Sequence, residues 1–88
     1  GEVLGGKGGK LDLHNGTTDL RTDMDKMWAA LIALEQSNLT NFTTLTAAAT
    51  GPLATLNPGF AAMVSDSTAV LLPTALPKDK ADLKGLLA

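Results

Sequence analysis

The segment LRTDMDKMWAALIAL, residues 20–34, carries the pattern that decides the fold. Apolar side chains recur in it at alternating intervals of four and three, at Leu20, Met24, Met27, Leu31 and Leu34. This spacing places all five side chains along one face of an α-helix, in the manner of the a and d positions of a coiled coil. The sequence therefore predicts a helix whose apolar seam packs against other helices.

The predicted helix runs over residues 17–50. Thr17 or Thr18 can cap its start, and Asp19 follows in the first turn, where the helix dipole favours a carboxylate. The dipeptide Gly51-Pro52 ends it. The alternative is that the helix frays at residues 37–38 and that the threonine-rich part is a loop or strand, because threonine is a mediocre helix former.

The apolar face of this helix is broader than a strict two-stranded zipper requires. Trp28, Ala29 and Ile32 flank the seam, and a broad face suits three or more packed helices. Continuing the heptad gives Asn38, Asn41, Leu45 and Ala48. Asparagine in a helical seam costs stability but fixes register and oligomeric state. Asn38 and Asn41 are therefore candidate polar layers in the core of a trimer, where a ring of amides could enclose water or an anion.

The middle of the chain is almost free of charge. The 42 residues from Gln36 to Pro77 contain one charged side chain, Asp66. A monomer of 88 residues buries a small core and is only marginally stable. The chain contains no cysteine, so disulfides cannot supply the missing stability. Self-association is the remaining way to cover and stabilise the uncharged middle.

Composition also argues against several partners. The net charge is −2 and the pI about 5.0, whereas a phosphate backbone calls for clustered Lys and Arg. The three aromatic residues, Trp28, Phe42 and Phe60, are too few for a base-stacking platform. We therefore expect no nucleic acid as a partner. The apolar runs are all shorter than the ~20 residues of a membrane span.

Residues 1–16 predict a short glycine-rich β segment. Leu11 and Leu13 alternate with Asp12 and His14, which is the period of a strand. The dipeptide Asn15-Gly16 is typical of a turn. Two strands are not stable alone, so other copies or further residues would complete the sheet.

Residues 51–88 predict shorter, proline-punctuated helices that pack on the long one. Asn57 can cap a helix over residues 58–71 with Pro58 in its first turn. The polar run at residues 65–68 could interrupt that helix. Pro73 and Pro77 break the chain, and a last helix is expected over residues 78–87. Trp28, Phe42 and Phe60 are expected to hold these outer helices against the seam.

Residues that could support chemistry are sparse. No serine or threonine has a spacing that marks a nucleophile, and the carboxylates form no evident acid/base pair. One histidine, His14, cannot build a metal site in a single chain, although symmetry could gather copies around an axis. We therefore expect no enzyme activity, no catalytic, cofactor or metal site, and no cofactor.

The order of these motifs resembles a known family. It contains the glycine-rich run at residues 3–13, VLGGKGGKLDL, then Thr18-Asp19-Leu20, then Gly51-Pro52, and finally ADLKGLL at residues 81–87. The chain resembles, over nearly its whole length, the C-terminal region of the baseplate spike, the cell-puncturing protein of contractile-tailed bacteriophages.

The resemblance implies a homotrimer on the tail axis, at the tip of the tail baseplate of the virion. Its expected partners are copies of itself, other tail and baseplate proteins, and the bacterial outer membrane as target. Spike tips of this family often carry a His-x-His pair whose copies bind iron. Leu13-His14-Asn15 supplies one histidine, so no metal site is carried over, and whether this segment is the piercing point stays open.

Together these observations predict a mainly α fold with a short N-terminal β segment, assembled as an intertwined homotrimer around a coiled-coil-like core. Leu20, Met24, Met27, Leu31 and Leu34 are its expected oligomer core. The expected function is structural, as part of a trimeric device that punctures the cell envelope. The alternative is a helical protein-binding module, or another viral fibre or stalk trimer.

Overall fold

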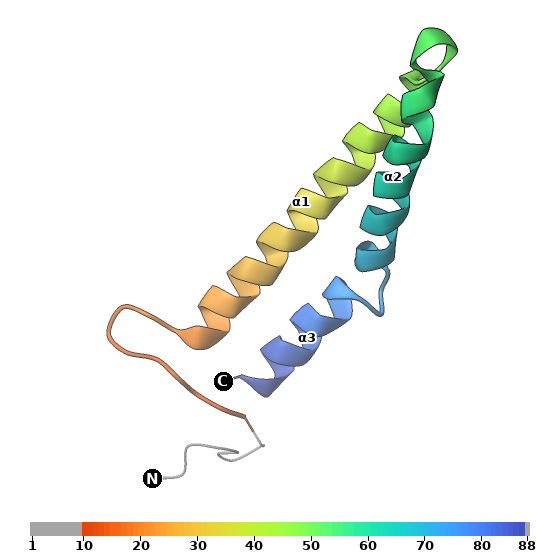
Figure 1. Ribbon diagram of the computed structural model, residues 1–88. Coiled ribbons are helices and arrows are strands. Elements are labelled where there is room, and N and C mark those ends of the chain that lie inside the picture. Colours follow the sequence, from red (N-terminus) through yellow and green to blue (C-terminus); the bar gives the residue numbers. More distant parts are fainter. Residues whose placement is uncertain (1–9, 88) are drawn as a thin grey trace.

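The protein is mainly α-helical. The structure, a computed structural model, describes residues 10–87. It contains a long helix α1 (Leu20–Ala48), a 3-10 helix η1 (Gly51–Leu56), and two further helices, α2 (Asn57–Leu71) and α3 (Leu76–Leu86). Figure 1 shows α1 running back along α2 and α3, so that the chain forms one long hairpin. The mainly α fold predicted from the sequence is confirmed.

A carboxylate, rather than a threonine, caps α1. Asp19 has an extended backbone, and its Oδ1 accepts hydrogen bonds from the backbone N–H groups of Arg21 and Thr22 at 2.9 and 3.3 Å. These are two of the four donors that a helix start leaves unpaired. The predicted cap at Thr17 or Thr18 is wrong because α1 begins at Leu20, directly after Asp19. Both threonines belong to the preceding turn, in which their N–H groups donate to Asn15 Oδ1 at 2.8 and 2.7 Å.

The threonine-rich half of α1 is helical throughout, and the fraying considered at residues 37–38 does not occur. The Oγ1 hydroxyls of Thr43, Thr44 and Thr46 donate to the carbonyl oxygens four residues earlier, at 2.6, 3.1 and 2.6 Å. Such bonds satisfy the hydroxyls but do not by themselves stabilise a helix. The low intrinsic propensity of threonine is instead overridden by the packing of α1 against α2.

The hairpin turns at Gly51, as its sequence predicts. Gly51 has φ +56, a left-handed conformation that side chains disfavour and glycine adopts freely. Asn57 is the first residue of α2 and not its cap, because the preceding Leu56 is already helical. Instead Asn57 Nδ2 donates to the Thr46 carbonyl oxygen at 3.0 Å. The same carbonyl accepts from the Ala49 N–H at 3.2 Å, so Asn57 adds a second hydrogen bond that ties the start of α2 to the end of α1.

Helix α2 continues through the polar run at residues 65–68 without the interruption that we considered. Ser67 in this run is 1% exposed, so a small side chain sits where α2 is most deeply buried. Residues 72–75 then form a turn before α3, which begins with Pro77 in its first turn. Both prolines thus act at helix boundaries, as predicted.

The predicted short β segment is not formed by residues 10–16. Within the described chain the extended backbone makes two isolated bridges, Leu11 with Leu87 and His14 with Asp19. The Leu11 N–H donates to the Leu86 carbonyl at 2.9 Å, so this segment pairs with the end of α3 rather than with another strand. The remainder of the predicted segment, residues 1–9, lies outside the described residues.

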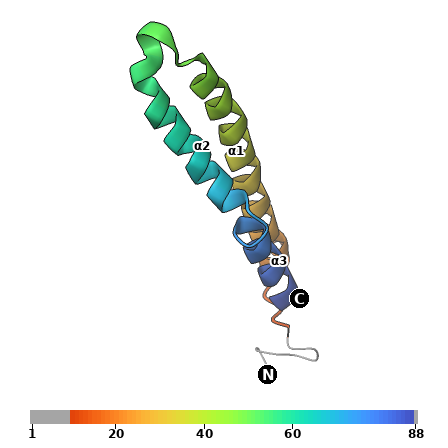
Figure 2. The ribbon, with the colours of Figure 1, turned by 90° about the vertical axis from the view of Figure 1, so that its right-hand side faces the viewer.

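The hairpin is long and thin. Its extents are 66 × 26 × 13 Å and its radius of gyration is 18.9 Å, against about 12 Å for a compact chain of this length. Figure 2 shows the same rod from the side, with α1 beside α2 and α3 along its length. Among residues 10–87 only Ala49, Ser67 and Leu87 are buried. A rod this thin leaves most apolar side chains partly exposed within one chain.

Candidate functional site

Helix α1 carries two heptad stripes, one residue apart. The first packs inside the hairpin: every member is half-buried or buried. Its members are Arg21, Asp25, Trp28, Ile32, Glu35, Leu39, Phe42, Thr46 and Ala49. The second is the predicted seam, displaced by one residue toward the N-terminus. We call these the packing stripe and the seam.

The seam remains exposed where it is most apolar. Met27, Leu31, Leu34 and Leu45 are 45%, 39%, 55% and 42% exposed. Each large exposed apolar residue of α1 belongs to the seam. Leu20 and Met24, nearer the start of the helix, are half-buried. Within a single chain, the other helices therefore cover the packing stripe, and no element covers the seam.

The two seam asparagines bond within their own helix. Asn38 Nδ2 donates to Glu35 Oε1 at 3.3 Å, and Asn41 Nδ2 donates to Ser37 Oγ at 3.4 Å. Asn38 is half-buried and Asn41 exposed. Both lie on the seam, as predicted. Their role as polar layers stays a prediction, because it concerns contacts between copies.

Charges in the packing stripe fasten the open end of the hairpin. Asp25 Oδ1 lies 2.9 Å from Lys80 Nζ on α3, and this partner holds the pKa of the Asp25 carboxyl below its ordinary value. Arg21 Nε donates to the Lys84 carbonyl oxygen at 3.3 Å. A cation at the last turn of α3 also opposes the negative end of the helix dipole. The first two turns of α1 are thereby tied to the middle and the last turn of α3.

Aromatic side chains fill the packing stripe further along. The rings of Phe42 on α1 and Phe60 on α2 have centroids 6.1 Å apart and planes inclined by 36°, within the range of favourable aromatic pairs. Phe42 and Phe60 thus hold α2 against α1, but they do so on the packing stripe and not, as expected, on the seam. Trp28 is half-buried, and its Nε1 is buried with no hydrogen-bond partner in the described chain.

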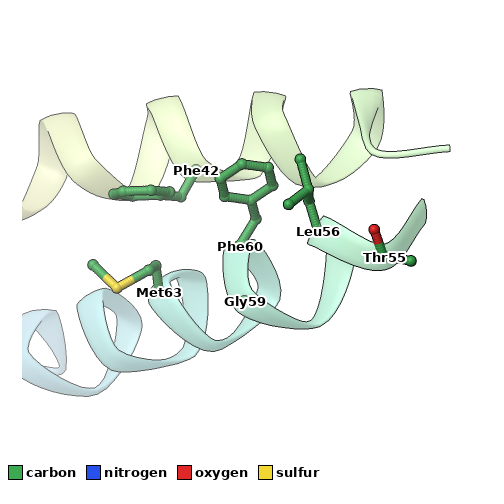
Figure 3. A pocket seen from close by; sticks show the side chains of 6 residues that line it. All are labelled: Phe42, Thr55, Leu56, Gly59, Phe60 and Met63. Atoms are coloured by element: carbon green, nitrogen blue, oxygen red, sulfur yellow. The ribbon is translucent and has the colours of Figure 1, made fainter. Parts of the chain in front are cut away.

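Apolar hollows flank the turn end of the hairpin. One, of about 430 Å³, is lined by Phe42, Thr55, Leu56, Gly59, Phe60 and Met63. Figure 3 shows the two phenylalanine rings between the helices, with Met63 and Leu56 on either side of them. A second hollow, of about 150 Å³, is lined by Leu45, Ala48, Ala49, Leu53, Leu56 and Phe60. The seam thus runs directly into an apolar end surface.

The segment Gly51–Leu86 has the length and composition of a membrane span, judged by those two properties alone. This differs from our expectation that no segment approaches a span. The helical course breaks at residues 72–75, so the continuous part covers residues 51–71. Each run of apolar residues in this part of the sequence is short, but one continuous helical stretch contains several of them.

His14 lies away from the seam, in the connection that precedes α1. Its Nδ1 is 2.8 Å from Asp12 Oδ1, and this carboxylate, with a smaller contribution from Asp19, raises the pKa of His14 above 6.5. Among residues 10–87 no group of three metal-ligating side chains comes together. The histidine therefore has a carboxylate partner in its own chain.

Comparison with known proteins identifies no relative: no family model, curated protein or solved structure matches this chain. The proposals below therefore depend on the residues themselves. Two features of the site have no clear signal in the sequence. The packing stripe does not stand out as an apolar heptad, because it contains charged and polar residues such as Asp25 and Glu35. The end hollows depend on how Phe42 and Phe60 meet, which no local pattern shows.

Proposed function

We propose that this chain is a structural, self-assembling helical module that forms a parallel homotrimer with α1 at its axis. The seam of Leu20, Met24, Met27, Leu31 and Leu34 forms the core, and Asn38 and Asn41 form polar layers within it. The observation that carries the proposal is the exposed seam. Four large apolar residues of the heptad, Met27, Leu31, Leu34 and Leu45, lie exposed on a helix whose other stripe is already packed.

The angle between the two stripes suits such an assembly. Neighbouring positions on an α-helix are about 100° apart. A helix with its seam toward a threefold axis therefore presents its packing stripe sideways, where α2 and α3 lie in the groove beside the next copy. The three α1 helices would form the inner layer and the shorter helices the outer one. Each outer helix is then in position to touch two copies.

The seam lacks the residue pattern of a two-stranded coiled coil. Two-stranded coiled coils prefer β-branched residues at a and leucine at d. In this seam the a positions are Met24, Leu31, Asn38 and Leu45, and none is β-branched. The chain directions also follow from charge. The end of the hairpin near residues 19–35 is charged and the turn end is not, so an antiparallel arrangement would bury charges against apolar side chains.

The resemblance noted above gives this assembly its proposed setting, the baseplate spike of a contractile-tailed bacteriophage, at the tail tip. There it would work mechanically, with other tail proteins as neighbours and the bacterial outer membrane as target. Stiffness is what such a part requires, and a threefold packed rod supplies it. No chemistry is needed for this role, in keeping with the sparse reactive residues.

Cysteine crosslinking tests the arrangement directly, because the natural chain contains no cysteine. Leu34→Cys should form disulfide-linked pairs of chains rapidly on mild oxidation, since a parallel, in-register seam brings each copy of residue 34 close to the others. Ala33→Cys is the matched control. It is exposed and adjacent in sequence, but points away from both stripes and should crosslink slowly. Equal rates for the two variants would contradict the proposal.

A helical protein-binding module remains the second candidate. The hollow between Phe42, Phe60 and Met63 favours it, because apolar hollows of this size can accept side chains of a partner. The two functions differ in what covers the seam. A binding module would be a monomer in solution, with the seam and the hollow both open to a different protein.

A further inference from the structure

The turn end of the hairpin carries no charge on any face. Phe42 lies opposite Phe60, so in the antiparallel pair Gln36 and Asp66 lie at about the same height. Glu35 is the last charged residue on α1, and Asp66 is the first on α2. The last charged residues before the turn therefore lie at about the same height along the hairpin on both helices. We call the part beyond that level, residues 36–65, the tip.

Self-association explains only part of this. A trimer covers the seam, but the outward faces of α1 and α2 would still meet water, and soluble surfaces commonly carry about 25–35% charged residues. The outward-facing, exposed positions of the tip instead hold small or neutral side chains, including Thr40, Thr43, Thr44, Ala47, Ala61, Ala62 and Ser65. The tip thus fits surroundings in which charge is disfavoured on every side.

Several polar groups of the tip are also paired within the hairpin. The hydroxyls of Thr43, Thr44 and Thr46 donate to carbonyl oxygens of their own helix, and Asn57 Nδ2 donates to the Thr46 carbonyl. A hydroxyl or amide that is already hydrogen-bonded costs far less to remove from water than an unpaired one. The neutral surface can therefore leave water without losing these bonds.

The far end of the tip presents apolar side chains outward. Leu53 and Leu56 in η1 are 54% and 48% exposed, and both line the smaller hollow. Residues 51–65 of the tip are the first part of the longer segment Gly51–Leu86, which has the length and composition of a membrane span, judged by those two properties alone. Exposed leucines at the end of a rod, with no charge near them, would enter a hydrocarbon phase readily.

We propose that the tip is a lipid-inserting element, which enters a bilayer end-on. The proposal rests on the proposed function for the parallel arrangement that brings three tips to one end. The 13 helical residues from Gln36 to Ala48 correspond to about 20 Å of helix. This exceeds one leaflet of the ~30 Å hydrocarbon core but does not span it. Glu35 and Asp66 mark the level at which insertion stops, because their charges stay in water.

Tryptophan placed at the tip reports insertion. In the full chain, Leu53→Trp should shift its emission to shorter wavelength, and brominated lipids should quench it, when phosphatidylcholine vesicles are added. Leu86→Trp is the matched control at the opposite end, because Leu86 is 53% exposed and Leu53 54%. It should respond no more than the natural chain, whose Trp28 supplies the background. The tip response should be insensitive to salt, since no charge takes part.

A charge at the tip separates lipid contact from contact between copies. Leu53→Asp should weaken vesicle binding by about tenfold or more and leave the molar mass in solution unchanged, while Leu86→Asp should affect neither. If Leu53→Trp shows no shift or quenching, the lipid proposal is overturned. A lower mass for Leu53→Asp would also overturn it and assign the tip to contact between copies. The mass of the natural chain, measured without lipid, tests the trimer independently.

Discussion

Replacing Leu31 with aspartate tests the seam at its centre. Leu31 is 39% exposed in the hairpin, so the single chain depends on it only in part. In the proposed trimer three copies of this side chain meet near the axis. Leu31→Asp should therefore dissociate the assembly while the isolated hairpin stays helical.

The magnitude follows from the exposed fraction. Full burial of a leucine side chain is worth about 1.5–3 kcal/mol, so the 39% still exposed corresponds to about 0.6–1.2 kcal/mol per copy. Three copies contribute about 2–4 kcal/mol, which is roughly a 30- to 800-fold change in association constant. Three carboxylates brought close together out of water add several kcal/mol of further cost. Assembly should be lost at micromolar concentration.

Sedimentation equilibrium over a range of concentrations measures this effect, with circular dichroism to follow helix content. Ala33→Asp serves as the control, because it adds the same charge to the same helix at an exposed position, about 200° around the helix from Leu31. It should leave the assembly intact. If Leu31→Asp keeps the mass of the natural chain, the seam is not the contact between copies and the reasoning is refuted.

Three further perturbations follow from the hairpin itself. Asp12→Asn should lower the pKa of His14 toward 6.5, measured by NMR titration, because Asp12 is the main cause of the raised value; an unchanged pKa would contradict the contact. Asp19→Ala should lower stability by about 0.5–2 kcal/mol through loss of the helix cap, seen as a lower Tm. The pKa of Asp25 is depressed by Lys80, so the stability this pair adds is present above about pH 3.8 and is lost as pH falls through the folded pKa. Lys80→Met should remove that part of the acid dependence of Tm, whereas an unaltered acid dependence would count against the pair.

The sequence was most informative where one signal dominates a long segment. The heptad from Leu20 to Leu34 and the stop at Gly51-Pro52 located α1 to within three residues of each end. The prolines and asparagine of the second half located α2 and α3 similarly well. The prediction of the helix cap was wrong because of local side-chain hydrogen bonds. The N–H groups of Thr17 and Thr18 donate to Asn15 Oδ1 in a turn, so the helix begins later than predicted and Asp19 is its cap.

The candidate site was predicted only in part, for a physical reason. Periodicity showed that α1 has an apolar face, but not that two stripes share the helix. The packing stripe contains Asp25, which pairs with Lys80, and Glu35, and both are only half-buried. Because of these charged residues, the hydropathy of the sequence does not distinguish this stripe from its neighbours. The prediction of a β segment was wrong for residues 10–16, because a strand forms only where a partner strand is available. In residues 10–16 the available partner is the end of α3.

The molar mass of the unaltered chain in solution tests the central claim most directly. Light scattering after size exclusion, at several loading concentrations, should give three times the chain mass of 9.0 kDa. That result would make the exposed seam the axis of a trimer. A stable mass of one chain at every concentration would contradict the account, and the seam and tip would then be surfaces for a different partner.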